Sequence, residues 1–402
     1  MHNHIKTSFV AAAGCAAFCA VAFFTASPLR AAEKPDYKAT AERIVGECAG
    51  VKAGDRVVVR GEIRDIEFIE EISLAVWRRG AEPIQILGRE RAARRYFDEV
   101  PAKFDAVPAD FSLKLAGIQT VDIEIWGEEF PGKLDTVPAA RTAAGDQRWQ
   151  TVYQAKLKAG VRQLGIGNGL YPTDATAKQF GLTKAQLADL YWAGINVDYA
   201  KLQAKGAAVK AILAAGKEVR VTHPNGTNLT CRVAGRPVFV SDGVISAENA
   251  AKGGAAAQVW LPAGEVYFAP VPGSAEGKVV FDSIPYGAGE IRRLIHTVKA
   301  GKMVGHTADS GPEYKLWKER YAAAPAGKDE FAGVDIGINP NVKVPAGSKL
   351  MTWIPAGTVT LSFGGNAGSE GSNPISWGSG GSMNGCTLTV DGKVVIENGV
   401  LK

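Results

Sequence analysis

The sequence predicts an α/β N-terminal domain with a parallel sheet, followed by a β-rich α+β C-terminal domain. A strand, an amphipathic helix and a second strand follow one another within residues 55–87. After residue 217 short alternating strands become frequent. The chain has 402 residues, of which 46% are hydrophobic, so it is long enough for two cores. We place the two domains at 33–210 and 211–402, with the boundary near 205–217.

The first 32 residues predict a signal peptide. A weakly positive start precedes an apolar run from Phe9 to Phe24, and Leu29-Arg30-Ala31-Ala32 supplies small residues for cleavage. The run is slightly short for a membrane span. We therefore expect a periplasmic or secreted protein without a stable membrane span after cleavage. An uncleaved anchor is the alternative.

Charge and cysteine content narrow the possible functions. The formal net charge of +5 is small for this length and gives no basic stripe, so we expect no nucleic-acid partner. Cys48, Cys231 and Cys386 follow the predicted signal, and their spacing resembles neither a zinc site nor a CxxC pair. We expect buried free thiols, although an oxidising compartment allows one disulfide.

Periodicity predicts the elements of the first domain. Ile66, Ile69 and Ile72 lie on one face of a helix, and Gly80 follows its end. The flanking strands give a βαβ unit, which implies a parallel sheet. We expect helices over 36–54 and 66–79, strands over 55–61, 83–87, 121–126 and 165–171, and a helical region over 172–217.

Alternating apolar and polar residues predict the strands of the second domain. We expect them over 219–222, 229–233, 237–240, 266–269 and 291–298. From Phe331 to Gly392 the chain is rich in Gly, Ser and Asn, which is typical of short strands joined by tight loops that approach a ligand closely.

Several short motifs in this region carry a family resemblance. They are Ile336-Gly337-Ile338-Asn339-Pro340, Gly357-Thr358-Val359 before Leu361–Asn366, and Val390-Asp391-Gly392; earlier ones are Pro224–Thr230 and Leu261–Tyr267. Their order and spacing resemble the aminopeptidase T family of thermophilic-type metallo-aminopeptidases. The resemblance implies that family's fold, a homodimer, and a pair of metal ions held by carboxylates and histidines.

The resemblance also implies where the metal ligands should lie. The family's first glutamate ligand corresponds to Glu265, so a glutamate is present at this position. The other positions correspond to Gly333, Thr360, Ser376 and Gly378, and none of these offers a strong ligand side chain. No histidine follows His306 in the sequence, so a small shift in the alignment cannot restore the two histidines.

A replacement ligand set is the alternative that the residues leave open. His306 and Asp309 have the i,i+3 spacing that would place both on one face of a helical turn. Further candidates are His296, His223, Asp335 and Glu330. A histidine beside glycine in a turn is more often solvated or hydrogen-bonded, so we regard these as weak alternatives.

We therefore favour a binding protein on a metallopeptidase scaffold. Its former cleft would be bounded by Glu265, Asn339, Thr360, Asn366, Ser376 and Trp377, and would bind a peptide or small molecule without a cofactor. Glu265 would pair with a ligand amine and Trp377 would stack on it. The alternative is an active aminopeptidase with rewired ligands for zinc, cobalt or manganese. A related iron-dependent ring-cleaving dioxygenase also needs C-terminal histidines, which disfavours that activity.

Overall fold

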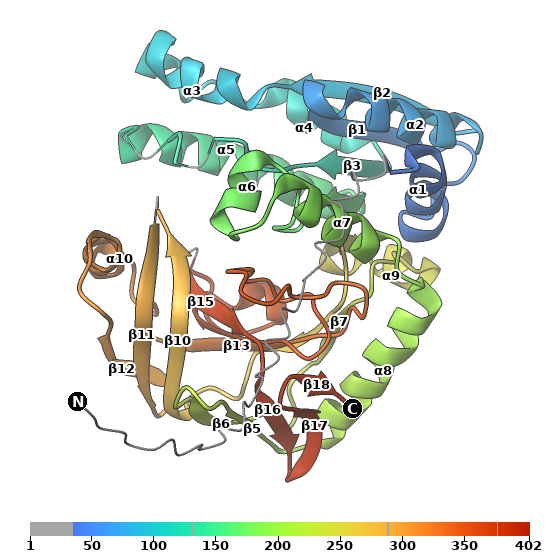
Figure 1. The fold of residues 1–402 in the computed structure, drawn as a ribbon. Coiled ribbons are helices and arrows are strands. Elements are labelled where there is room, and N and C mark those ends of the chain that lie inside the picture. Colours follow the sequence, from blue (N-terminus) through green and yellow to red (C-terminus); the bar gives the residue numbers. More distant parts are fainter. Residues whose placement is uncertain (1–34, 131, 135, 288, 376) are drawn as a thin grey trace, which may run out of the picture.

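The structure is a computed structural model that describes residues 35–402 except 131, 135, 288 and 376 (Figure 1). The predicted signal peptide of residues 1–32 lies outside the described residues. Within the described part of the chain, every helix is too short or too polar to cross a membrane.

Five parallel strands form sheet A in the order β2-β1-β3-β4-β8. Their bounds are β1 Arg56–Glu62, β2 Glu82–Gly88, β3 Val121–Ile125, β4 Arg162–Ile166 and β8 Gln258–Leu261. Helix α2 (Ile66–Trp77) connects β1 to β2, which confirms the predicted βαβ unit. The predicted strand over 165–171 is placed too late, because the observed strand begins three residues earlier and ends five residues earlier. Gly167, Asn168 and Gly169 all have positive φ and turn the chain after Ile166.

Helices connect the strands of sheet A and then lead to the second half of the chain. Helix α1 covers Tyr37–Arg43 and continues as a π-helix over Ile44–Cys48, so the first predicted helix ends earlier than residue 54. The others are α3 Glu90–Glu99, α4 Asp110–Ile118, α5 Ala139–Lys158, α6 Asp174–Gln179, α7 Lys184–Ile195 and α8 Tyr199–Ala215. The last three confirm the predicted helical region.

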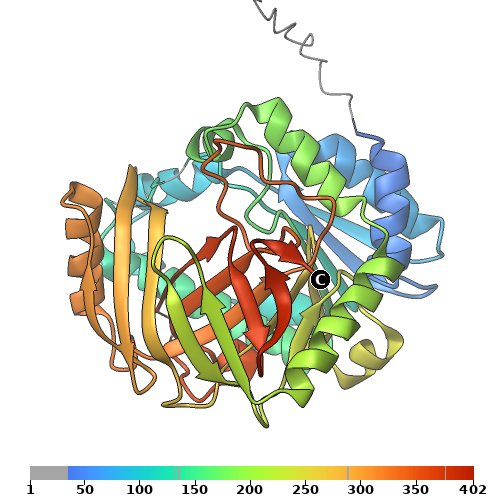
Figure 2. The same ribbon diagram turned by 60° about the horizontal axis from the view of Figure 1, so that its bottom comes forward.

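Two sheets of antiparallel strands make up the β-rich half (Figure 2). Sheet B has the order β12-β11-β10-β6-β5-β16-β17-β18, and sheet C has the order β15-β14-β13-β9-β7. In sheet B the strands are β5 Glu218–Thr222, β6 Asn228–Arg232, β10 Glu276–Tyr286, β11 Gly289–Lys299, β12 Lys302–Thr307, β16 Thr387–Val390, β17 Lys393–Glu397 and β18 Val400–Leu401. In sheet C they are β7 Phe239–Ser241, β9 Glu265–Phe268, β13 Phe331–Gly337, β14 Val359–Gly364 and β15 Gly378–Met383.

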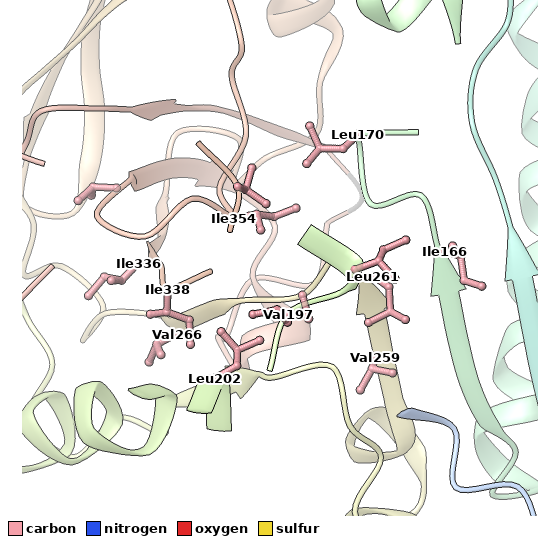
Figure 3. Close-up of a cluster of buried hydrophobic side chains, with 14 of the residues drawn as sticks. Ile166, Leu170, Val197, Leu202, Val259, Leu261, Val266, Ile336, Ile338 and Ile354 are labelled. Carbon is pink, nitrogen blue, oxygen red and sulfur yellow. The ribbon is translucent and has the colours of Figure 1, made fainter. Parts of the chain in front are cut away.

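Two further helices complete this half, namely α9 (Ala247–Lys252) and α10 (Pro312–Ala323). One continuous core joins the two halves. Figure 3 shows Leu261 of sheet A on one side of Val197, with Leu202 of α8 and Val266 of sheet C on the other side, and all four residues are buried. The predicted fold class is therefore confirmed. Cys48, Cys231 and Cys386 are free and buried, as expected.

Candidate functional site

One face of sheet C is apolar and the other is polar. Val266, Val334 and Leu361 are buried on the first face. Because side chains alternate along a strand, the residues between them point to the opposite face. There Glu265, Tyr267, Asp335 and other polar residues are half-buried. Half-buried polar side chains on a sheet face indicate a surface that solvent or a ligand reaches.

The register of sheet C places four polar side chains side by side. Tyr267 is opposite Asp335, Asp335 is opposite Thr360, and Thr360 is opposite Ser382. The hydroxyls of Thr360 and Ser382 are 2.7 Å apart and hydrogen-bonded. We call these four residues the polar row. Directly opposite side chains in antiparallel pairs contact one another, so the row is continuous across four strands.

Glu265 lies diagonally beside the polar row. It is opposite Gly337, two residues along β13 from Asp335, and opposite Ser241 on its other side. The absence of a side chain at Gly337 allows the backbone carbonyls of Trp353 and Pro355 to lie where a Cβ atom would be. The segment that contains Trp353 therefore packs on the polar face next to Glu265.

The surroundings of the two carboxylates favour their protonated forms. Burial raises the pKa of Glu265, and the nearby Asp335 raises it further; burial also raises the pKa of Asp335. Burial, Glu265 and Asp335 together raise the pKa of Tyr267. Neither carboxylate forms a hydrogen bond or an ion pair with a described residue. The pair therefore has no counter-ion among the described residues, and it carries its full negative charge only above these raised pKa values.

The polar row ends beside a cavity. Ser382 lines a cavity of about 420 Å³, together with Phe281, Lys349 and Met351. Lys349 belongs to the loop between β13 and β14, which crosses towards α6 and α7 in Figure 1. A hydrogen bond of 2.8 Å from the Lys349 N–H to the Phe180 carbonyl holds this loop. The loop thus forms one wall of the approach to the polar row.

Asn339, a predicted cleft residue, is completely buried. Its side-chain amide donates hydrogen bonds to the carbonyls of Gly194 and Ala263, at 3.1 and 2.6 Å. Its Oδ1 accepts a bond of 3.0 Å from the Asn341 N–H. Asn339 thereby joins α7, the start of β9 and the β13–β14 loop, and its polar atoms already have partners.

The predicted residues near the C-terminus lie further along the sheet. Gly378 is opposite Gly364, four residues along β15 from Ser382, which corresponds to about 13 Å. Trp377 lies just beyond it and has its ring 5.6 Å from that of Tyr321. The Oδ1 atom of Asn366 accepts a hydrogen bond from the Asn373 N–H at 2.9 Å. These residues are not brought next to Glu265, and Ser376 lies outside the described residues.

The predicted helical turn at His306 and Asp309 is wrong. His306 is on strand β12, and Asp309 follows the strand and donates its N–H to the Arg292 carbonyl. The ring of His306 hydrogen-bonds the Tyr314 hydroxyl through Nδ1 at 2.9 Å. Gly333 is opposite Ser362, whose Oγ would lie 3.1 Å from a Cβ atom at Gly333.

Sequence reasoning did not single out Ser382 or Tyr267, and it gave Asp335 only as one of several weak candidates. Alternation within β9 and β13 places Glu265 with Tyr267, and Asp335 with Gly333, on one face. The missing information was the pairing between strands that are far apart in sequence.

Comparison with known proteins identifies the family. A family model described as thermophilic metalloprotease (M29) matches residues 34–316, so the chain belongs to this family of metal-dependent aminopeptidases. The matched range includes Glu265 and ends before Gly333. The resemblance to the aminopeptidase T family is confirmed.

Solved structures support the fold. Wild-type AmpT from Thermus thermophilus superposes with a TM-score of 0.70 at 17% identity, over 91% of this chain and 98% of that chain. The 2,5-dihydroxypyridine dioxygenase from Pseudomonas putida KT2440 gives a TM-score of 0.60 at 13% identity, over 91% and 96%. No curated protein sequence matches the chain.

The family implies bound metal, so the donor set on the polar face decides whether a metal pair fits. Two divalent ions need several anionic oxygens or imidazoles. The described polar face offers the carboxylates of Glu265 and Asp335, with Thr360 and Ser382 as neutral hydroxyls. Among the described residues, no group of three or more His, Cys, Asp or Glu side chains is arranged to hold a metal ion. This donor set does not fit a two-metal centre.

Proposed function

We propose that the protein is an exported member of the family that binds the protonated amino group of a peptide or small molecule at Glu265 and Asp335. The observation that carries this proposal is the pair of adjacent, half-buried carboxylates without a partner among the described residues. A cationic amine supplies the counter-charge that the pair lacks. The homodimer that the resemblance implies stays a prediction.

The surroundings of the pair suit an ammonium group. An ammonium group donates up to three hydrogen bonds. Two of them would reach the carboxylates of Glu265 and Asp335, and the Trp353 carbonyl beside Gly337 is a third acceptor on the same face. The cavity beside Ser382 would accommodate the remainder of the ligand. Because binding requires deprotonated carboxylates, we expect the affinity to fall as the pH is lowered through their raised pKa values.

A direct test is titration calorimetry with trialanine and with N-acetyl-trialanine, which has no ammonium group. We expect trialanine to bind the protein and the acetylated peptide to bind at least about tenfold more weakly. Glu265→Gln, which keeps the shape and removes the charge, should weaken trialanine binding by about tenfold or more, which corresponds to about 1.4 kcal/mol. Asp335→Asn should act in the same direction.

Glu70→Gln is the matched control, because Glu70 is exposed on α2, far along the chain from sheet C. It should leave the affinity unchanged. Equal affinity for the free and acetylated peptides, or unchanged binding by Glu265→Gln, would remove the carboxylate pair from the site.

The second candidate is an active metal-dependent aminopeptidase with a replacement ligand set. Membership of a metal-dependent family favours it, and so does the position of Asp335 two residues from Gly333 on the same face. Metal would then polarise the scissile carbonyl and supply hydroxide. Stoichiometric metal in the purified protein separates this candidate from the amine-binding proposal.

A further inference from the structure

Sheet A has one apolar face and one polar face, which is unusual for a parallel sheet because helices normally cover both faces. Val57, Val59 and Ile123 are buried on the first face. The alternate residues on the second face include Arg60, Asp122 and Glu124. The packing of the sheet does not explain these polar side chains, so they indicate a binding site on this face.

A cavity of about 600 Å³ covers this polar face. Its floor includes a row across four strands, in which Arg60 is beside Glu124, Glu124 is beside Gly165, and Gly165 is beside Trp260. Residues of helix α5, among them Trp149 and Lys156, form a wall. The site belongs to sheet A and shares no residue with the polar row of sheet C.

Three indole rings line the cavity. A Cβ atom at Gly165 would lie 2.9 Å from Cδ1 of Trp260 and 3.1 Å from Nε1 of Trp126, so both rings converge over the glycine beside Glu124. On α5, the ring of Trp149 stacks on that of Tyr153, with centroids 5.1 Å apart. Trp126, Trp149 and Trp260 are 43%, 58% and 38% exposed, so packing within the chain leaves much of each ring surface free.

The two carboxylates in the cavity differ in their ion pairs with described residues. Asp122 forms ion pairs with Arg60, at 2.9 Å, and with Lys156. Glu124 forms no hydrogen bond or ion pair with a described residue, although it lines the same cavity. Burial raises the pKa of Glu124 and the charge of Asp122 raises it further, whereas the charges of Lys156 and Arg60 lower it, so that the net shift is upward. Arg148 also lines the cavity; Arg148 and Glu124 are both exposed, so solvent partly screens the charges of both side chains.

We propose that this cavity binds an organic ammonium ion, with the Glu124 carboxylate as counter-ion and the indoles of Trp126 and Trp260 against its methyl or methylene groups. Aromatic faces attract cations, and tryptophan does so most strongly. A carboxylate beside the rings attracts a cation, whereas a neutral ligand of the same shape gains no such electrostatic attraction. The combination therefore selects a cation over its neutral isostere.

The test uses calorimetry and tryptophan fluorescence with choline and n-butylammonium as probes. The neutral isostere of choline, 3,3-dimethyl-1-butanol, is the control ligand. We expect at least one cation to bind saturably and to change the fluorescence, and the neutral alcohol to bind at least about tenfold more weakly. Glu124→Gln should weaken cation binding by about tenfold or more.

Glu82→Gln is the matched control variant, since Glu82 is exposed on the neighbouring strand β2 of the same sheet. It should bind as the wild type does. Trp260→Leu provides a second variant that removes an aromatic wall and keeps Glu124, and it should also bind more weakly. The proposal is overturned if neither cation binds saturably, if the neutral alcohol binds equally well, or if Glu124→Gln binds normally. Because the variants at Glu265 leave this cavity intact, the two sites are tested independently.

Discussion

Asp55→Ala is expected to lower the free energy of unfolding by about 3–5 kcal/mol, because it leaves the buried guanidinium of Arg162 without its counter-ion. Nη2 of Arg162 is 2.6 Å from Oδ2 of Asp55, and the two side chains are only 11% and 6% exposed. Arg162 also donates to the carbonyls of Ala49 and Gly50. The pair thus ties the segment after α1 to strands β1 and β4.

The environment of Asp55 supports this magnitude. Burial by itself raises the pKa of Asp55, but hydrogen bonds from Arg162, the Lys52 N–H and Thr120 outweigh it, so the pKa is lowered. A lowered folded-state pKa contributes stability above the unfolded-state value, and this stability is lost as the pH falls through the folded-state value. Stability from the pair is therefore fully present at neutral pH.

Chemical denaturation at pH 7 measures this effect. Asp174→Ala is the control, because Asp174 forms an exposed ion pair with Lys184 at 3.3 Å and should contribute at most about 1 kcal/mol. A loss below about 1 kcal/mol for Asp55→Ala would contradict the structural role of the buried pair.

His296 is expected to make the fold sensitive to acid. It is completely buried, and neither ring nitrogen has a hydrogen-bond partner among the described residues. Its ring contacts those of Phe363, at 4.7 Å between centroids, and Trp317, at 5.8 Å. Burial lowers the pKa of His296 from 6.5 to about 3, and the neighbouring His306 contributes to the shift.

The direction of the pH effect follows from this shift. Between about pH 3 and 6.5 the unfolded state binds a proton at His296 that the folded state does not bind, so stability falls as the pH falls through this window. At pH 5 the expected loss from this residue is about 2 kcal/mol relative to neutral pH. His296→Phe removes the titrating group and keeps an aromatic ring among its neighbours.

Denaturation curves at pH 7.5 and about pH 5 test this prediction. The wild type should lose about 2 kcal/mol more than His296→Phe over this interval. His223→Gln, in the turn between β5 and β6, is the control substitution and should keep the wild-type acid sensitivity. If His296→Phe and the wild type lose equal stability, His296 does not titrate in this window.

Periodicity within short segments predicted much of the fold. The apolar face of residues 66–79 and the flanking strands gave the βαβ unit correctly, because each pattern is local. The strand over 165–171 was placed late because glycine and asparagine can continue a strand or turn it, and here Asn168 takes positive φ. The i,i+3 spacing of His306 and Asp309 is compatible with a helical turn. It is equally compatible with the end of a strand, which is what the structure has.

The sites needed information that the sequence does not carry locally. Glu265 was found through the family motif, but its neighbours depend on the register between β9, β13, β14 and β15. Trp126 and Trp260 meet over Gly165 although they are far apart along the chain. Only the pairing of β3, β4 and β8 brings them together, and alternation cannot predict which strands pair.

The central claim is that Glu265 and Asp335 bind an amine in place of a metal pair, and metal content tests it most directly. The purified protein would be incubated with zinc, cobalt, manganese and iron(II), dialysed, and analysed by elemental mass spectrometry. We expect no stoichiometric metal, because the described donor set lacks the ligands that two divalent ions need. One or two retained ions per chain, lost in Glu265→Gln and Asp335→Asn, would contradict the claim and favour an active metallo-aminopeptidase.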